Sequence, residues 1–538
     1  MPIIIGKDRN QMSMFCLEQE IDKHAEVRLI DAFVDWLPLE EMNFQTKGKS
    51  MEGRPAYQTG DLLKLYIYGY LNRIRSSRQL EKHSRINMEL QWLLKGLLPC
   101  HQTINTFRKN NGRSLRKVFR KFNSFLRGEG VFDEDTVAID GSKFRAQNSK
   151  KNNYNEKKVK DHLKYIDKQT DRYLKDLEEN DQAEISDSTE ENRLLIAEKL
   201  ADLSVRRKKY ESLKKEIELA HEKGITQIST TDPDARALPK KMNIVEVSYN
   251  VVTSVEAKNK LITNYEVTNK HDTHALSLAA RKAKKVLGKT GKESIKVLAD
   301  KGFETGAELK NCIENHIETY VAPRKRVNAL KDPRFNKSQF SYDHEKDIYT
   351  CPQGEQLKSN GKKYRKNTGK LRKPYMVKHY KLTFSTCNNC IHRLACAGPS
   401  NLKNSKGRYI ERNEYEDYIE ENRERVRLNK PLYRQRQSIV EHPYGTIKRQ
   451  WGFDYTLLKT IPKVSGEFAL IFTAYNLRRA ISIFGVEDLL KRLGRPFVRL
   501  EMLLLAYYKP FFTPFFNIQI RPPRLIFDIN SYKRTKIA

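Results

Sequence analysis

The sequence predicts an α/β core built on a mixed sheet with flanking helices, together with an all-α N-terminal domain and a helical insertion. Three observations lead to this fold class. Strand-like and helix-like segments alternate between residues 244 and 323, apolar residues recur at helical spacing between residues 61 and 109, and charged heptads fill residues 196–217. The chain has 538 residues, more than one core usually organises, so several domains are expected.

The helical domain is predicted over residues 1–130. A helix with a buried face is expected over residues 61–74, shorter helices over 76–82 and 88–94, and another over 103–109. This last helix has an apolar underside, and Arg108 and Lys109 belong to its basic, amide-bearing outer part. Because helix-turn-helix proteins place such a helix in the major groove, we predict that Arg108 and Lys109 contact DNA. Any small helical bundle would show the same pattern.

The core is predicted to start with a strand over residues 136–141 and to be interrupted by an insertion over 151–225. Heptad spacing of Ile196, Leu203, Tyr210 and Ile217 indicates a helical hairpin or short coiled coil there, serving as a spacer or a dimer contact. The core then resumes as a hairpin of two strands (244–251, 261–267), a helix (275–286), a strand (295–299), a helix (306–315) and a strand (318–323).

Two aspartates end strands in matching contexts. Asp140 and Asp300 each follow an apolar strand and precede a glycine by one or two residues. Groups at strand carboxyl ends face the functional crevice of such sheets, and two carboxylates there can share divalent cations. Aspartate is also an ordinary turn former at strand ends.

A third carboxylate lies in a basic helix. Arg434, Glu441 and Lys448 are spaced by seven residues and so share one helical face. Glu441 could bind a metal while the two cations hold phosphates, although a surface ion-pair ladder has the same spacing.

The composition is strongly basic. Lysine and arginine total 101 against 67 acidic residues, a net charge of +34, which is costly in a folded protein unless a polyanion is nearby. Nucleic acid is therefore the expected partner, although a ribosome-associated or membrane-surface protein would have the same balance. The most apolar stretch, residues 503–516, is interrupted by Lys509, Pro510 and Pro514 and is too short to span a membrane.

Four of the seven cysteines lie in a basic insertion over residues 331–430. Cys387 and Cys390 form a CxxC pair, with Cys351 before it and Cys396 after it. Four thiolates would complete a structural zinc site, and free reduced cysteines in a reducing cytosol are the alternative. Residues 356–385 contain ten Lys/Arg and no acid, which favours a finger that grips the DNA backbone.

These residues resemble a known family. AIDGSKFRA around Asp140, VLADKGF around Asp300 and VEHPYGTIKRQWGF around Glu441 are similar to the DDE triad of bacterial insertion-sequence transposases. TDPDARALPKK, HDTHAL and AYNLRRAI also occur in the expected order, so the resemblance extends from about residue 20 to about residue 485.

The resemblance implies an RNase H-like core in which Asp140, Asp300 and Glu441 are catalytic and hold two Mg²⁺ or Mn²⁺ ions. Lys448 matches the lysine of the family's Tyr-Arg-Glu-Lys signature, whereas Tyr433 and Arg436 stand one residue earlier than the pattern. The residues expected to contact DNA here are therefore Lys448, Arg434, Arg436 and Tyr433.

The implied activity is cleavage at the ends of an insertion sequence and transfer of the 3′-hydroxyl ends to target DNA. Expected partners are double-stranded DNA, as terminal inverted repeats and target, and further copies of the chain on paired ends, in a bacterial cytoplasm at the nucleoid. A metal-dependent nuclease without strand transfer and a DNA-binding regulator with an inactive core are the alternatives.

The remaining predicted boundaries are 131–150 and 226–330 for the core, 431–490 for helices carrying Glu441 and 491–538 for a tail.

Overall fold

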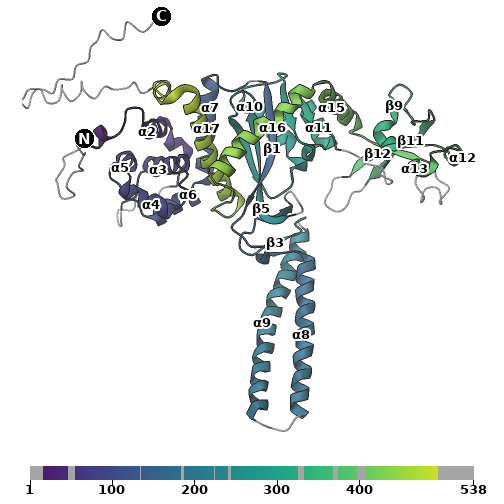
Figure 1. Ribbon diagram of the computed structural model, residues 1–538, viewed down its shortest axis with the longest axis horizontal. Coiled ribbons are helices and arrows are strands. Elements are labelled where there is room, and N and C mark those ends of the chain that lie inside the picture. The colour runs from purple at the N-terminus through teal and green to yellow at the C-terminus, as the bar shows by residue number, and fades with distance from the viewer. Residues whose placement is uncertain are drawn as a thin grey trace, which may run out of the picture.

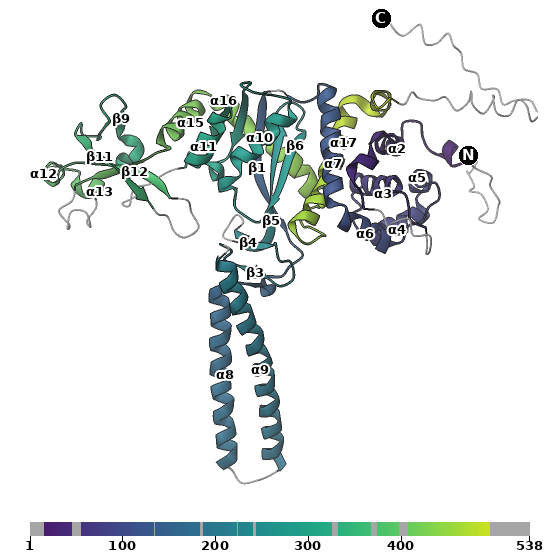
Figure 2. The same ribbon diagram turned by 180° about the vertical axis from the view of Figure 1, so that it is seen from behind.

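The computed structural model places a mixed sheet at the centre of the molecule. A helical domain lies on one side of it, a smaller sheet on the other, and a long helical hairpin projects away from it (Figure 1); Figure 2 shows this arrangement from behind. The described residues are 16–45, 55–133, 135–182, 187–222, 224–239, 244–324, 332–366, 374–397 and 407–494. Among the helices they form, none is long and apolar enough to cross a membrane; the apolar stretch 503–516 lies outside these ranges.

The N-terminal region is helical, as predicted. Its elements are α1 (Leu17–Glu20), α2 (Glu26–Trp36), η1 (Leu39–Met42), α3 (Thr59–Leu71), α4 (Ser77–Ile86), α5 (Met88–Leu93), α6 (His101–Asn110) and α7 (Gly112–Gly128). Helix α3 is buried along ten consecutive residues, from Leu62 to Leu71, because α2, α5 and a C-terminal helix enclose it. The domain thus packs around α3.

The central sheet is mixed, as predicted. Its strands are β1 (Thr136–Arg145), β4 (Arg236–Pro239), β5 (Val245–Glu256), β6 (Ile262–Thr268), β7 (Ile295–Ala299) and β8 (Ile317–Val321). The order is β4-β5-β1-β7-β8, and β6 pairs with β5. Strand β5 is antiparallel to β1 and to β6, whereas β7 is parallel to β1 and to β8. The parallel connections run through α10 (Leu276–Val286) and α11 (Gly306–Glu314).

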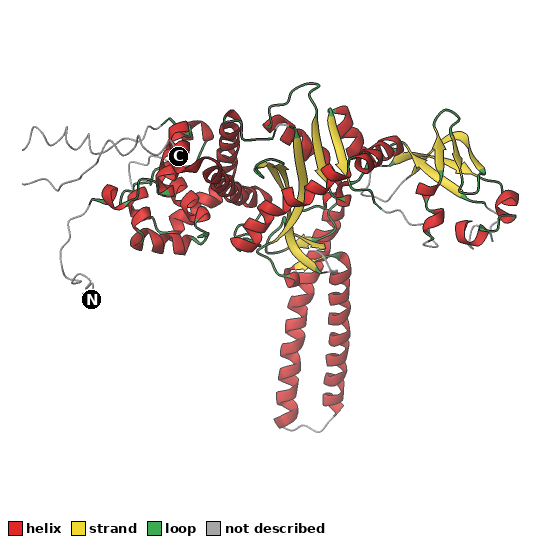
Figure 3. Ribbon diagram, turned by 45° about the horizontal axis from the view of Figure 1, so that its top comes forward, coloured by secondary structure: helices red, strands yellow, loops and turns green. Residues whose placement is uncertain are grey.

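Helices cover both faces of this sheet (Figure 3). On one face, α16 (Lys430–Tyr444) reaches β5 through the Tyr444 hydroxyl, which accepts a hydrogen bond of 2.9 Å from Thr253. On the other face, the neighbouring Ser254 donates to the Ala279 carbonyl of α10 at 3.4 Å. Because successive strand residues point to opposite faces, α16 and α10 lie on opposite sides of the sheet.

The insertion forms a helical hairpin of α8 (Glu156–Gln182) and α9 (Asp187–Glu222). At its base β2 (Asn153–Tyr154) pairs with β3 (Ile228–Ser229). The heptad positions face inward: Ile196, Leu203 and Ile217 are buried along α9. The hairpin therefore buries a narrow apolar seam, which fits the highly charged sequence around it.

Helix α17 (Ile461–Arg492) joins the helical domain to the core. It packs against α7, α3, α2 and α6 on one side and β6 on the other. Its start is capped by Asp232 and Asp234, whose carboxylates accept from the backbone N–H groups of Thr460 (3.1 Å) and Ile461 (2.7 Å). Midway, the buried Asn476 side chain accepts from Ile262 N–H at 2.9 Å. The TDPDAR and AYNLRRAI segments thus fix this helix in place.

A second sheet occupies the cysteine-bearing region, where the sequence analysis predicts no strands. It consists of β9 (Ser341–Asp343), β10 (Ile348–Thr350), β11 (Gln356–Lys366), β12 (Tyr375–Lys381) and β13 (Tyr409–Asn413), in the order β13-β12-β11-β10-β9. Two short helices, α12 (Phe384–Asn388) and α13 (Arg393–Ala397), follow β12, and α15 (Glu416–Leu428) leads from β13 to α16.

Candidate active site

Asp140 and Asp300 lie side by side at the centre of the sheet. Ile139 of β1 is in register with Ala299 of the parallel strand β7, so the next residue along each strand is one of the two aspartates. The Asp300 carboxylate caps the turn that follows β7 by accepting from Gly302 N–H at 2.7 Å. The pair that the sequence analysis singled out is therefore brought together by strand pairing.

The Asp140 carboxyl group is held in an unusual electrostatic environment. Burial and, next, the neighbouring Asp300 carboxylate raise its pKa and the Arg436 guanidinium of α16 lowers it, which together leave the pKa at about 6. A partly buried carboxyl group beside a second carboxylate is a site where negative charge is poorly compensated. A divalent cation would supply the missing positive charge, and the hard oxygen donors of two aspartates suit Mg²⁺.

A third aspartate, Asp272, faces this site from the opposite side of β1, where no sequence-based prediction places it. Its carboxylate accepts from the Asn250 side-chain amide at 2.6 Å and lies 3.7 Å from the Lys143 ammonium. A Cβ atom on Gly141 would stand only 2.7 Å from the Asp272 Cγ. The usable signals were the HDTHAL segment and the polar Asn250 within the buried part of β5.

Helix α16 lies over the same face of the sheet as Asp140 and carries Glu441. The Tyr444 hydroxyl anchors the helix by donating to the Val251 carbonyl at 2.8 Å. The Glu441 carboxylate is exposed and accepts from the Gln437 side chain at 2.8 Å. Among the described residues, Asp140, Asp300 and Glu441 do not gather within 4.8 Å of one another. The structure thus pairs the two aspartates and holds Glu441 on the adjacent helix.

The residues expected to contact DNA have different environments. Arg434 and Lys109 are exposed, and Arg436 and Tyr433 are partly buried. Lys448 lies in the π-helical segment η8 (Gly445–Gln450), donates to the Lys143 carbonyl at 2.6 Å and stands 4.1 Å from the Phe144 ring centre.

Arg108 corrects the prediction of a DNA contact. Its side chain is only 3% exposed, and its guanidinium donates to the Tyr70 hydroxyl at 3.1 Å and the Arg75 carbonyl at 3.0 Å. It therefore holds the interior of the helical domain together. The helical spacing placed Arg108 on the outer side because the neighbouring helix α3, which covers it, is distant in sequence.

The four cysteines of the basic insertion line one pocket. Cys351 follows β10, Cys387 belongs to α12, Cys390 follows that helix, and Cys396 belongs to α13. Burial and, to a lesser extent, the thiols of Cys387, Cys351 and Cys390 raise the pKa of Cys396 and the Arg408 guanidinium lowers it, which together leave the pKa at about 11. Strand pairing and two short helices thus bring together residues that are far apart in sequence.

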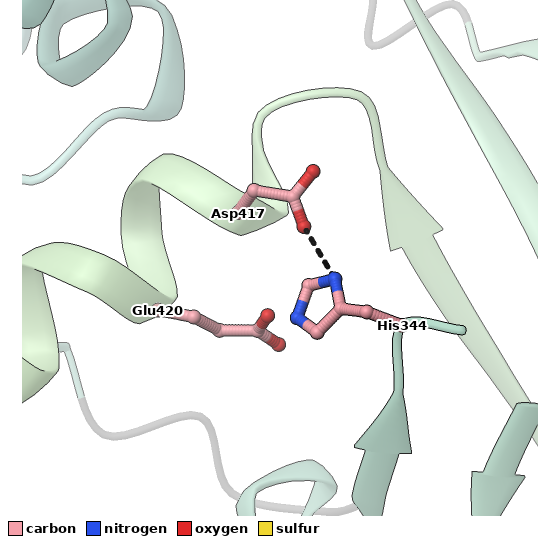
Figure 4. A group of neighbouring side chains, drawn as sticks. All are labelled: His344, Asp417 and Glu420. Carbon is pink, nitrogen blue, oxygen red and sulfur yellow. Dashed lines mark ion pairs between the residues drawn. The ribbon is translucent and has the colours of Figure 1, made fainter. Parts of the chain in front are cut away.

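A separate group of possible metal ligands lies between the turn after β9 and the first turns of α15. His344, Asp417 and Glu420 each place a ligand atom within 4.8 Å of the others, and Figure 4 shows the His344 ring pointing at both carboxylates. However, both Glu420 oxygens already accept from the Arg412 guanidinium, at 2.8 and 2.7 Å, and Asp417 pairs with the same group. The group could hold a cation only in competition with Arg412, so we describe it as an ion-pair network that joins α15 to the sheet.

Two family models match the sequence. A transposase domain (DUF772) matches residues 15–110, and a transposase DDE domain matches residues 350–481. Both matches support a DDE transposase. The first match spans most of the transposase's helical domain, and the second runs from β10 into α17. The second match includes Glu441 and the four clustered cysteines, whereas Asp140 and Asp300 precede it.

The other comparisons add little to this assignment. No curated protein matches the transposase. Among solved structures, the cryo-EM structure of a piggyBac transposase synaptic complex with hairpin DNA is similar over 91% of this chain and 82% of its own. The sequence identity is 11% and the TM-score is 0.28. A TM-score this low supports no conclusion about this transposase.

The pKa of Asp140 gives the metal-free transposase a specific pH dependence. The Asp140 carboxyl group loses its proton near pH 3.8 in the unfolded chain and near pH 6 in the folded chain. Its contribution to the free energy of unfolding is therefore fully present below pH 3.8 and is lost as the pH rises through 6. We expect Asp140→Asn to be more stable than wild type in chelator at pH 8, by up to about 3 kcal/mol, because it carries no buried charge.

Urea unfolding from pH 4 to pH 8 measures this effect. The difference in free energy of unfolding between Asp140→Asn and wild type should grow between about pH 4 and pH 6. The difference between Asp454→Asn, changed at an exposed position, and wild type should not grow over this range. A gap that does not change with pH would contradict the assigned environment of Asp140.

Proposed function

We propose that this chain is the transposase of a bacterial insertion sequence, which binds the ends of its element, cleaves DNA and transfers the 3′-hydroxyl ends to target DNA. The observation that carries the proposal is the pairing of Asp140 and Asp300 on adjacent parallel strands, beneath a helix that carries Arg436 and Glu441. The family assignment supports the same chemistry.

The proposed catalytic centre has three carboxylates. Asp140 and Asp300 would hold two Mg²⁺ or Mn²⁺ ions, and Glu441 would complete the set by releasing Gln437 and turning toward the strands. When bound, the two ions activate a water or a 3′-hydroxyl and stabilise the leaving oxygen. Arg436, which already faces Asp140, is suited to hold a non-bridging phosphate oxygen of the same strand.

The sheet order supports an RNase H-like type for this core. Strands β6, β5 and β1 form an antiparallel half, and β7 and β8 continue it in parallel with β1. This arrangement puts Asp140 on the central strand and Asp300 on its neighbour. We assign the core to the RNase H-like type on this basis.

DNA is the proposed partner, in two roles. The exposed Lys109 of α6 and the helical domain around it are suited to the element ends. Strands β11 and β12 form an antiparallel hairpin whose exposed basic side chains can track phosphates without reading sequence. Because cutting and joining at two ends must be coordinated, we propose that copies of the chain assemble on paired ends.

Cleavage of DNA that carries the gene's own flanking sequences tests the proposal. With Mg²⁺, wild type should nick at the element boundaries, expose 3′-hydroxyl groups and join them to a second duplex. Asp300→Ala should lose both reactions and still bind the ends, whereas the exposed Asp454→Ala should retain both. Cutting without joining would indicate a nuclease, and binding without metal-dependent cutting would indicate a regulator; either result would overturn the proposal.

A further inference from the structure

We propose that Cys351, Cys387, Cys390 and Cys396 bind one structural zinc ion that holds the second sheet together. This metal would be distinct from the ions of the catalytic centre, because soft thiolates prefer zinc and leave Mg²⁺ to carboxylates. The inference does not depend on the proposed function, since it concerns the stability of the β9–β13 region.

The four thiols converge on one pocket. Cys351 comes from the end of β10 and the other three from the α12–α13 stretch, and they line a single pocket of about 40 Å³, which is room enough for one metal ion. Phe335, Phe340, Leu382 and Ala397 contribute apolar groups to the wall, beside the polar Gln353, Glu355, Thr386, Arg393 and Arg408. The apolar part of the wall limits the access of water that would compete for the ion.

Two of the sulfurs accept hydrogen bonds from the backbone. The Cys387 sulfur accepts from the backbone N–H of Arg408 at 3.2 Å, and the Cys351 sulfur accepts from the N–H of Gln353 at 3.3 Å. Such donors stabilise a thiolate more than a thiol, because hydrogen bonds to charged acceptors are stronger. Arg408 also brings a positive charge to the site, which would offset part of the negative charge of four thiolates.

The described part of the second sheet lacks a core of ordinary size. Among its described residues, the buried apolar cluster has five members: Phe340, Tyr349, Leu357, Tyr380 and Ile410. Strand β11 is exposed at most of its positions. A core this small supplies little stabilisation, and protein modules of this kind usually depend on a metal or a disulfide. The cysteines are free, so a metal is the available cross-link.

Zinc binding should tighten the cluster. Tetrahedral ligation at about 2.3 Å requires sulfur–sulfur distances of about 3.8 Å. In the described region, no three of these sulfurs lie within 4.8 Å of one another. The ion would therefore draw the thiols inward by side-chain rotation and would connect the end of β10 to α12 and α13.

Metal analysis of the purified full-length chain tests the site. Elemental mass spectrometry should find about one zinc ion per chain in wild type, and Cys390→Ser should lower the zinc content at least about tenfold. Cys100→Ser is the matched control, because Cys100 is also a partly exposed cysteine but belongs to the helical domain. It should retain the zinc.

A second measurement keeps the test decisive if Cys390→Ser does not fold. In native wild type, Ellman's reagent should label the cluster thiols only after a zinc chelator is added, and chelation should lower the thermal midpoint. A metal-free wild type would overturn the proposal, as would iron in place of zinc, zinc retained by Cys390→Ser, or full thiol reactivity before chelation.

Discussion

Glu441→Gln should abolish metal-dependent cleavage, with a loss greater than about a hundredfold, while leaving end binding and stability near wild type. The expected size of the loss follows from metal chemistry, since even indirect partners of metal ligands cost about 10- to 100-fold when removed. Stability should be unchanged because the Glu441 side chain is exposed and its hydrogen bond is to Gln437 of the same helix. Single-turnover cleavage and an end-binding titration measure the two effects.

The controls separate a ligand from a surface charge. Glu424→Gln changes an exposed glutamate of α15 and should leave cleavage unchanged. Gln437→Ala should also leave cleavage near wild type, because the amide holds Glu441 away from the strands and supplies nothing to the reaction. If Glu441→Gln retains most of its cleavage, Glu441 is not the third ligand, and the side chain beside Asp140 and Asp300 that completes the site must be another.

The part of the site that could be predicted from sequence is the part that strand periodicity controls. Asp300 follows the end of β7 as predicted, whereas Asp140 lies in the middle of β1, which does not end near residue 141 but continues to Arg145 because it pairs with β5 along that length. Parallel pairing of β1 and β7 is nevertheless enough to place the two carboxylates together. The spacing of apolar residues also predicts the hairpin of β5 and β6 and the buried positions along α9, and the structure confirms both. Local periodicity carries this information because each element has a distinct buried face.

Long-range packing accounts for what the sequence did not indicate. Arg108 has the spacing of an exposed residue, yet a helix more than thirty positions earlier covers it. The second sheet has few buried residues, and its longest strand is exposed at most positions, so it shows no clean alternation. Asp272 acts through a contact with Gly141, which lies across 131 positions of chain that include the helical insertion. Such long-range contacts do not produce a periodic pattern of apolar residues in the sequence.

Gly141→Ala tests the packing behind Asp140, the proposed catalytic aspartate, and should have the second large effect. The added methyl group would overlap the Asp272 carboxylate, so either β1 or the turn at Asp272 must shift. Overpacking of this kind costs about 1–3 kcal/mol. Because Gly141 adjoins Asp140, a displacement of about 1 Å would also cost about a hundredfold in cleavage. Urea unfolding and single-turnover cleavage measure the two losses.

The pairing of Gly141 with Asp272 makes this effect specific. In an Asp272→Ala background the overlapping carboxylate is gone, so Gly141→Ala should cost at least about 1 kcal/mol less there than in wild type, as a double-mutant cycle would show. Gly128→Ala, at a position with no neighbouring atom within 4 Å, should be close to neutral and controls for the loss of a glycine. Strict additivity of Gly141→Ala and Asp272→Ala would mean that the methyl group is accommodated elsewhere, and Asp272 would then have no part in positioning Asp140.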